Sequence, residues 1–279
     1  MRKIGIIGLG HVGVTLLHDL VASRLVDEFV LIDPDEKKLE ADVLDMQDRT
    51  AITGSCPRFV CNDYAALQDA DIVVSSLGNI AHQATASNSR FAELLFTSQE
   101  VKKVAHSLRT SGFQGILVVI TNPCDIITQL YQEYTGFPRE RVIGTGTLLD
   151  TARMQRVVGE RFGLSPASVT GYTLGEHGNS QFTAWSQVVV KGQAISQLVG
   201  SDQLKELEQA ARMGGYRVFH GKGYTNFAIA AAAMRLLLAL LTDSREVLPV
   251  SQWDEKEEVY LGYPAVIGGL VLCRVLTCS

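Results

Sequence analysis

His177 lies in an unusual setting, because Gly175 and Gly178 flank it and Glu176 in the segment LGEHGNS. The chain has only six histidines, and the flanking glycines remove any packing reason for placing one here. Imidazole titrates near neutral pH, so histidine suits proton transfer to or from a hydroxyl group. A lone histidine is more often structural. A catalytic role therefore requires a carboxylate that orients the ring and a cation that holds a substrate.

Asp150 and Arg153 are candidates for these two groups and lie in the segment LLDTARMQ. Their i, i+3 spacing places both side chains on one face of a helix. An aspartate can set the tautomer of a histidine and stabilise imidazolium, and a guanidinium can grip a carboxylate through two N–H groups. In the alternative interpretation, Asp150 caps the helix and forms an ordinary surface ion pair with Arg153.

A glycine-rich turn follows the apolar stretch KIGII (3–7) and precedes a helical stretch. Gly8, Gly10 and Gly13 form the pattern GxGxxG, in which the first glycine permits a tight turn. The second lets backbone approach a pyrophosphate, and the third lets helix and strand pack closely. The helix N-terminus offers unpaired N–H groups to the phosphates. The turn thus indicates a dinucleotide site, although the pattern alone is weak.

Asp33 strengthens this indication, because it ends the stretch FVLID and lies 20 residues beyond Gly13. A carboxylate at this place binds the ribose hydroxyls of NAD. The next three residues (34–36) contain no arginine. They include two acids, whose negative charges would repel the 2′-phosphate of NADP. We expect NAD as the cofactor. The alternative is that Asp33 caps the helix expected over 36–48.

The first half of the chain alternates short apolar runs with helix-length segments. Continuous apolar runs of this length are typical of strands buried on both faces of a parallel sheet. The alternation predicts an α/β fold with a doubly wound, Rossmann-type parallel sheet. The expected strands are 3–7, 29–32, 71–77, 116–121 and 141–146, and the expected helices are 11–24, 36–48, 90–110 and 124–134.

From about residue 147 the pattern changes to mixed α+β. We expect an NAD-binding domain over 1–146 and a substrate domain over 147–279, with a ligand cleft where they meet. The expected helices of the second part are 148–163, 202–214 and 223–242. Its strand-like stretches are 168–178, 184–195, 247–253 and 259–268.

The composition limits the partners that this chain can have. A formal net charge of -5 gives no basic surface for nucleic acid. Five cysteines without a CxxC pattern indicate reduced thiols rather than disulfides or a zinc site, which suits the cytoplasm. The most apolar stretch (227–241) is too short to cross a bilayer and contains Arg235. We expect a cytoplasmic protein with no metal and no membrane contact.

Four motifs together resemble the L-lactate/malate dehydrogenase superfamily: GxGxVG, TNPCD (121–125), LLDTARM and LGEHGNS, in the order typical of that family. Within it, GNI (78–80), RFAEL (90–94) and GKGYT (221–225) are most similar to the L-2-hydroxyisocaproate dehydrogenases of lactic acid bacteria. The resemblance runs from the N-terminus to about residue 268. It implies a homo-oligomer, either a dimer or a tetramer.

The resemblance also implies roles for individual residues. His177 would be the proton acceptor and donor, Asp150 its orienting partner and Arg153 the carboxylate clamp. Arg90 would polarise the substrate carbonyl from a loop (78–90) that closes over the site. Taken without the resemblance, Arg90 is simply the first exposed residue of a helix.

The remaining implied roles concern the pocket and the cofactor. Asn122 would bind a substrate oxygen near the nicotinamide, and Thr225 would line the pocket for the substrate side chain. The implied cofactor contacts are Gly8, Gly10, His11, Val12, Gly13, Asp33, Gly78 and Asn122.

The loop NIAHQATASNS (79–89) bears on the substrate. It contains no arginine or lysine for the second carboxylate of malate, and it lacks the QxxGExR pattern of typical lactate dehydrogenases. We expect an NAD-dependent L-2-hydroxyacid dehydrogenase acting on an aliphatic 2-oxo acid such as 2-oxoisocaproate. The alternatives are an L-lactate dehydrogenase acting on pyruvate and a catalytically impaired NAD-binding protein.

The chain ends in GLVLCRVLTCS (269–279), where family members continue through another strand and an amphipathic helix. This stretch does not alternate as a half-exposed strand does. We expect that the C-terminal helix is missing because the C-terminus is truncated or altered, with a cost in stability.

Overall fold

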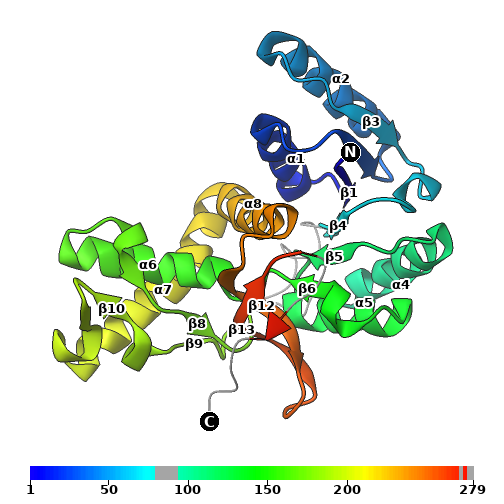
Figure 1. The fold of residues 1–279 in the computed structure, drawn as a ribbon. Helices are drawn as coiled ribbons and strands as arrows, with labels where there is room; N and C mark the ends of the chain where they lie inside the picture. The colour runs from blue at the N-terminus through cyan, green and yellow to red at the C-terminus, as the bar shows by residue number, and fades with distance from the viewer. Residues whose placement is uncertain (79–93, 270–272, 275–279) are drawn as a thin grey trace.

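A computed structural model describes residues 1–78, 94–269 and 273–274 of the chain (Figure 1). Its main sheet has the order β14-β13-β12-β6-β5-β4-β1-β2-β3. The first six strands in the sequence run parallel, and the last three are antiparallel to their neighbours. The parallel strands are β1 (Lys3–Ile7), β2 (Glu28–Ile32), β3 (Arg58–Cys61), β4 (Ile72–Ser75), β5 (Ile116–Val119) and β6 (Val142–Gly144). The antiparallel strands are β12 (Glu246–Asp254), β13 (Val259–Ile267) and β14 (Cys273–Arg274).

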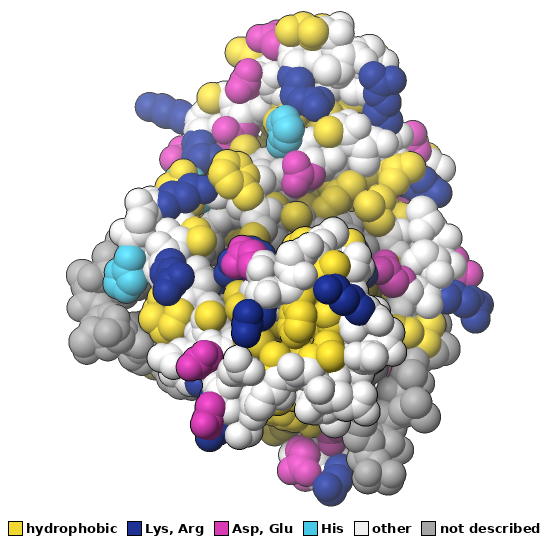
Figure 2. Space-filling view, turned by 90° about the vertical axis from the view of Figure 1, so that its left-hand side faces the viewer, with side chains coloured by type: hydrophobic (Ala, Val, Ile, Leu, Met, Phe, Trp, Pro, Cys, Tyr) yellow, Lys and Arg dark blue, Asp and Glu magenta, His cyan; other side chains and the backbone are white. Residues whose placement is uncertain are grey.

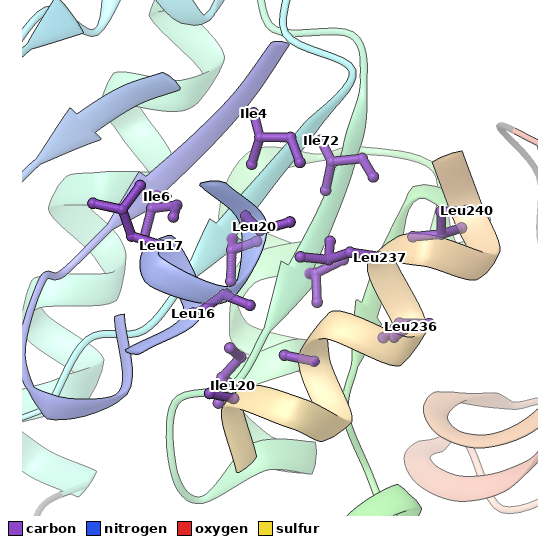
Figure 3. Packing of buried hydrophobic residues seen from close by; sticks show 14 of the residues in the cluster. Ile4, Ile6, Leu16, Leu17, Leu20, Ile72, Ile120, Leu236, Leu237 and Leu240 are labelled. Atoms are coloured by element: carbon purple, nitrogen blue, oxygen red, sulfur yellow. The ribbon is translucent and has the colours of Figure 1, made fainter. Parts of the chain in front are cut away.

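Helices cover both faces of the parallel strands, because alternate strand residues are apolar on each side. One face packs against α1 (His11–Ser23), α2 (Glu36–Thr53) and α8 (Phe227–Thr242). The other face packs against α4 (Leu94–Ser111) and α5 (Cys124–Thr135). Figure 3 shows leucines of α1 and α8 on the same side of the sheet as Ile4 and Ile72, with which they form one core cluster. The predicted α/β doubly wound fold is confirmed.

The second part of the chain forms a smaller layer of α6 (Leu148–Phe162) and α7 (Ser201–Lys222) over short strands. Its core includes Met154, Val158, Val190, Ile195 and Leu207. The short strands are β7 (Val169–Thr170), β8 (Thr173–Leu174), β9 (Phe182–Thr183), β10 (Val189–Val190) and β11 (Gln193–Ala194). Single 3-10 turns lie at Ala65–Leu67, Arg139–Arg141, Pro166–Ser168, Trp185–Gln187 and Ile195–Gln197.

The two parts of the chain are continuous in space. β12 pairs with β6 of the parallel sheet, and α8 packs against α1. Strands from beyond residue 245 therefore extend the sheet formed by the first half. The proposed domain boundary after residue 146 stays a prediction.

Several elements differ from the sequence-based expectation; α8, for example, begins at Phe227 rather than at 223, and the strand-like stretch 184–195 contains the 3-10 turn Trp185–Gln187. β3 was missed because it is a four-residue edge strand whose side chains are half-buried or exposed. α2 continues to Thr53 and stops at Gly54, which adopts the left-handed conformation that suits a helix end. α7 runs through Gly214 and Gly215 to Lys222, whereas the expected helix ended at 214.

The surface carries charges of both signs. In Figure 2, which views the molecule from the left-hand side of Figure 1, acidic and basic side chains are interspersed among hydrophobic ones. No helix in the described part of the chain is long and apolar enough to cross a membrane. Near the C-terminus, Cys273–Arg274 pairs with β13 as a short strand. The rest of the stretch expected to be altered (270–272 and 275–279) lies outside the described residues.

Candidate active site

The candidate site lies where the carboxyl ends of β1, β4 and β5 meet the loop after β8. β1 and β4 are neighbours, with β2 and β3 on one side and β5 and β6 on the other. Connections therefore leave in opposite directions from this point, which is where open α/β sheets bind their ligands.

The glycine-rich turn after β1 is shaped by close backbone packing. Gly8 has φ +91°, and a Cβ there would lie 2.6 Å from the carbonyl oxygen of Ser76. A Cβ at Gly13 would lie 2.0 Å from the carbonyl oxygen of Gly8, so only glycine lets α1 start this close to the strand. Gly10 is the N-cap of α1 and is exposed. His11, Val12 and Gly13 then form the first turn of α1.

Asp33 fastens this turn to the end of β2. One of its carboxylate oxygens accepts the Leu9 N–H at 2.7 Å, and the other accepts the Asp35 N–H at 2.9 Å. The cap of α2 is Asp35, whose side chain accepts the Lys38 N–H. The alternative that Asp33 is merely the helix cap is therefore wrong.

A cavity of about 590 Å³ opens beside this turn. Its lining combines the backbone of Gly8 and Gly10, the Asp33 carboxylate, and apolar groups such as Ile32 and Val104. A cavity at a helix N-terminus, with a carboxylate and apolar side chains in its lining, could hold the adenosine end of a dinucleotide.

The loop after β8 is held at several points. Gly175 has φ +89°, and its N–H and C=O pair with Gly262 of β13 at 2.9 and 2.8 Å. Two residues later, Nδ1 of His177 lies 2.5 Å from Oδ2 of Asp150. A Cβ at Gly178 would lie 2.5 Å from the Glu176 carboxylate, so this glycine makes room for the glutamate. The His177 ring keeps 13% of its surface exposed, whereas the Asp150 side chain is buried.

Asp150 also binds Arg153, whose Nη1 donates to Oδ1 at 2.9 Å. The i, i+3 pair predicted from the sequence is thus present, but it is largely buried rather than on the surface. Thr147 is the N-cap of α6, so Asp150 is not the capping residue. One buried carboxylate therefore joins an imidazole and a guanidinium.

Two family models cover almost the whole chain. Residues 2–144 match the NAD binding domain of lactate/malate dehydrogenase, and residues 147–277 match its alpha/beta C-terminal domain. The chain belongs to the lactate/malate dehydrogenase family. It is an NAD-dependent dehydrogenase of L-2-hydroxy acids.

Relatives and solved structures agree with this assignment. L-lactate dehydrogenase 1 of Bifidobacterium longum is 36% identical over 274 residues, which span 94% of this chain and 86% of the relative. L-lactate dehydrogenase of Staphylococcus saprophyticus is 36% identical over 276 residues, or 95% of this chain and 86% of that one. The ligand-bound crystal structure of the minor L-lactate dehydrogenase of Enterococcus mundtii has a TM-score of 0.92 and 30% identity. The match covers 100% of this chain and 91% of that one.

Arg153 lies against the glycine pair of α7. A Cβ at Gly215 would lie 3.0 to 3.3 Å from the guanidinium, closer than ordinary contact. A Cβ at Gly214 would lie 3.6 Å or more from its neighbours, which is ordinary contact. Gly215 therefore preserves space beside the guanidinium.

The other predicted residues occupy separate loops of this dehydrogenase. Gly78 follows β4 and lines the cavity, and Asn122 is exposed between β5 and α5. Thr225 is half-buried in the connection between α7 and α8. Arg90 and the loop 79–89 lie outside the described residues.

Several groups near the cofactor cavity were missed by the sequence analysis. The Lys38 ammonium donates to the Leu9 carbonyl at 2.6 Å, and Asn62 accepts the Asp33 N–H at 3.0 Å. Asn62 directly follows β3. Because that strand was not predicted, no site residue was expected at its carboxyl end. Tyr224 stacks on His11 with ring centroids 3.7 Å apart, and Asn226 donates to Thr15 at 2.9 Å. These contacts fasten the α7–α8 connection to the start of α1.

Proposed function

We propose that this dehydrogenase reduces a 2-oxo monocarboxylic acid with NADH, that pyruvate is its first candidate substrate, and that His177 transfers the proton. The relatives named L-lactate dehydrogenase support pyruvate. The observation that carries the proton-transfer role is the 2.5 Å contact between Nδ1 of His177 and Asp150, whose other oxygen accepts from Arg153.

Asp150 prepares His177 for this task. Its buried carboxylate accepts the Nδ1–H, which leaves Nε2 as the nitrogen that exchanges a proton with the substrate. In the reduction, Nε2 of protonated His177 donates to the substrate carbonyl oxygen. In the reverse direction, Nε2 accepts the hydroxyl proton, and Asp150 stabilises the imidazolium that forms.

Arg153 supplies the cation that orients the substrate. It lies one helical turn beyond Asp150 on α6, so the substrate carboxylate would sit beside the imidazole. A guanidinium has five N–H donors, and a substrate carboxylate can accept two of them while another stays on Asp150. This orientation presents the carbonyl to His177.

The glycine-rich turn and Asp33 would hold the cofactor. Bound NADH supplies the hydride that the reaction requires. The Gly10 backbone would face the pyrophosphate, and Asp33 would accept from the ribose hydroxyls. We also assign carbonyl polarisation to Arg90, substrate-oxygen binding to Asn122 and the side-chain pocket to Thr225.

A larger aliphatic substrate such as 2-oxoisocaproate is the second candidate. The observation that favours it is Gly215, whose lack of a Cβ lets the guanidinium that would bind the carboxylate pack closely against α7. The loop 79–89 also consists largely of small residues and has no lysine or arginine.

NADH oxidation with pyruvate, 2-oxoisocaproate and oxaloacetate in parallel tests this proposal. We expect turnover with both monocarboxylic acids and little with oxaloacetate, and the ratio of their kcat/KM values ranks the two candidates. A preference for oxaloacetate would contradict the proposal, as would NADH binding without turnover on any of the three.

A further inference from the structure

Asp125 is a buried carboxylate close to the candidate site, and the proposed chemistry does not use it. It lies in the first turn of α5 and is 6% exposed. Burying a carboxylate costs free energy unless hydrogen bonds compensate for the lost water. In Asp125, two hydrogen bonds supply this compensation.

Each oxygen of Asp125 accepts a hydrogen bond from a different element. Oδ2 accepts the backbone N–H of His177 at 2.7 Å. Oδ1 accepts the hydroxyl of Ser251, in β12, at 2.5 Å. Ser251 is fully buried. Asp125 thus joins α5, β12 and the histidine loop, although Ser251 lies 126 residues further along the chain.

The two aspartates hold the two ends of one residue. Asp125 holds the backbone of His177, and Asp150 holds the ring of His177. The pairing of Gly175 with Gly262 fixes the loop two residues earlier. A displaced backbone would swing the ring away from Asp150, and misplacement by about 1 Å costs roughly 100-fold in rate.

We propose that Asp125, oriented by Ser251, is a positioning residue that sets the backbone of His177 so that its ring meets Asp150. This inference rests on the proposed role of His177 in proton transfer. Burial raises the pKa of Asp125, and the donors Ser251 and His177 N–H oppose that rise. Glu176 also raises it.

Three variants separate positioning from charge. Asp125→Ala removes the acceptor, Ser251→Ala removes one donor, and Asp125→Asn keeps an oxygen for the His177 N–H while its amide can donate to Ser251. Thr135→Val is the matched control. Thr135 is a buried residue on the same helix, and its hydroxyl bonds to Tyr131, Gln132 and Phe137 near the helix end, with no hydrogen bond to the histidine loop among the described residues. Each variant is measured for kcat and KM with pyruvate and 2-oxoisocaproate, for NADH affinity, and for the low-field NMR signal of the His177 Nδ1 proton.

We expect Asp125→Ala to lower kcat roughly 10- to 100-fold and to shift or remove the imidazole signal, with NADH affinity within about twofold. Asp125→Asn should recover most of kcat and the signal, and Ser251→Ala should fall between them. Thr135→Val should change neither.

Three results would overturn the inference. They are an Asp125→Ala enzyme with unchanged kcat and imidazole signal, an Asp125→Asn enzyme as impaired as Asp125→Ala, or a Thr135→Val enzyme with the same losses. Should Asp125→Ala fail to fold, an unchanged imidazole signal in Ser251→Ala would overturn it. The NMR arm needs no turnover, so it separates failure of this inference from failure of the proposed substrate.

Discussion

At the scale of single residues, the Asp150 carboxylate contacts two different groups, one with each oxygen. One oxygen meets Nδ1 of His177, and the other accepts from Arg153. In the proposed mechanism, the group that would set the tautomer of the proton donor therefore also places the cation that would hold the substrate. Because Asp150 is 3% exposed, water does not screen either interaction strongly.

Asp150→Asn tests this double task. An amide in place of the carboxylate removes the charge that stabilises imidazolium and can present the wrong group to Nδ1. We expect kcat to fall by about 10²- to 10⁴-fold, with KM for the 2-oxo acid also raised because Arg153 loses its anchor. NADH affinity measured by fluorescence should stay within about twofold. A variant that retains half of the parent kcat would contradict the assigned role.

The spacing of Asp150 and Arg153 predicted a shared helix face, and the structure has it. The contact of Asp150 with His177 was expected only from the family resemblance, because 27 residues separate the two along the chain. Asp125 and Ser251 were not predicted, since a buried aspartate and a buried serine have no periodicity that marks them. Tertiary packing alone brings them to the histidine loop.

At the scale of elements, α7 keeps two glycines in its interior where it passes α6. Each glycine costs roughly 0.5–1 kcal/mol of helix stability relative to alanine. Steric contact explains why residue 215 is glycine, because a Cβ there would press on the Arg153 guanidinium. The same explanation does not apply to Gly214, where a Cβ would make only ordinary contacts. The helix expected over 202–214 continues in the structure to Lys222, and propensity alone does not reveal the contact with Arg153.

Gly215→Ala and Gly214→Ala form a matched pair of tests. We expect Gly215→Ala to raise KM at least about threefold, and more for 2-oxoisocaproate than for pyruvate, because the displaced guanidinium takes room from the substrate. Gly214→Ala should leave KM unchanged and raise the free energy of unfolding by about 0.5–1 kcal/mol. Steady-state kinetics and urea unfolding measure both effects. Equal KM values for the two variants would refute the explanation.

The stack of Tyr224 on His11 joins the α7–α8 connection to the glycine-rich turn. An aromatic pair contributes about 0.5–1.5 kcal/mol, so Tyr224→Leu should weaken NADH binding roughly 2- to 12-fold. Tyr224→Phe keeps the ring and should bind NADH like the parent. Fluorescence titration of NADH measures the change, and equal affinities in all three proteins would show that the stack does not support the turn.

At the scale of the whole molecule, one sheet carries both halves of the site. The parallel strands position the cofactor turn, and β12 and β13 extend the same sheet towards the histidine loop through Ser251 and Gly262. The apolar runs predicted the parallel strands, since burial on both faces leaves a clear pattern. The joining of β12 to β6 was not predicted, because a single antiparallel pairing across 107 residues leaves no local signal.

Tyr131 makes the stability of the packed sheet and helices depend on pH. Its hydroxyl lies 2.8 Å from Ser75 Oγ in a fully buried contact between α5 and β4. Burial raises the pKa of Tyr131, and the hydrogen bond with Ser75 opposes that rise. A raised pKa in the folded state means that the stability from this group is present below pH ~10 and is lost as the pH rises further.

Tyr131→Phe should therefore be about 1 kcal/mol less stable than the parent at neutral pH, through the lost hydrogen bond. The difference should shrink as the pH rises above about 10, because phenylalanine has no group to ionise. Urea unfolding of both proteins across this range measures the gap. A gap that widens with pH would contradict the assignment of the titration to Tyr131.

The central claim is that His177, held by Asp150, transfers the proton in an NADH-dependent reduction of 2-oxo acids. The most direct measurement is a single-turnover reaction of His177→Asn with NADH and pyruvate or 2-oxoisocaproate, combined with NADH titration. We predict that NADH binds with affinity within about twofold of the parent, while hydride transfer slows by at least about 10²-fold. Hydride transfer at the parental rate in the variant would contradict the account.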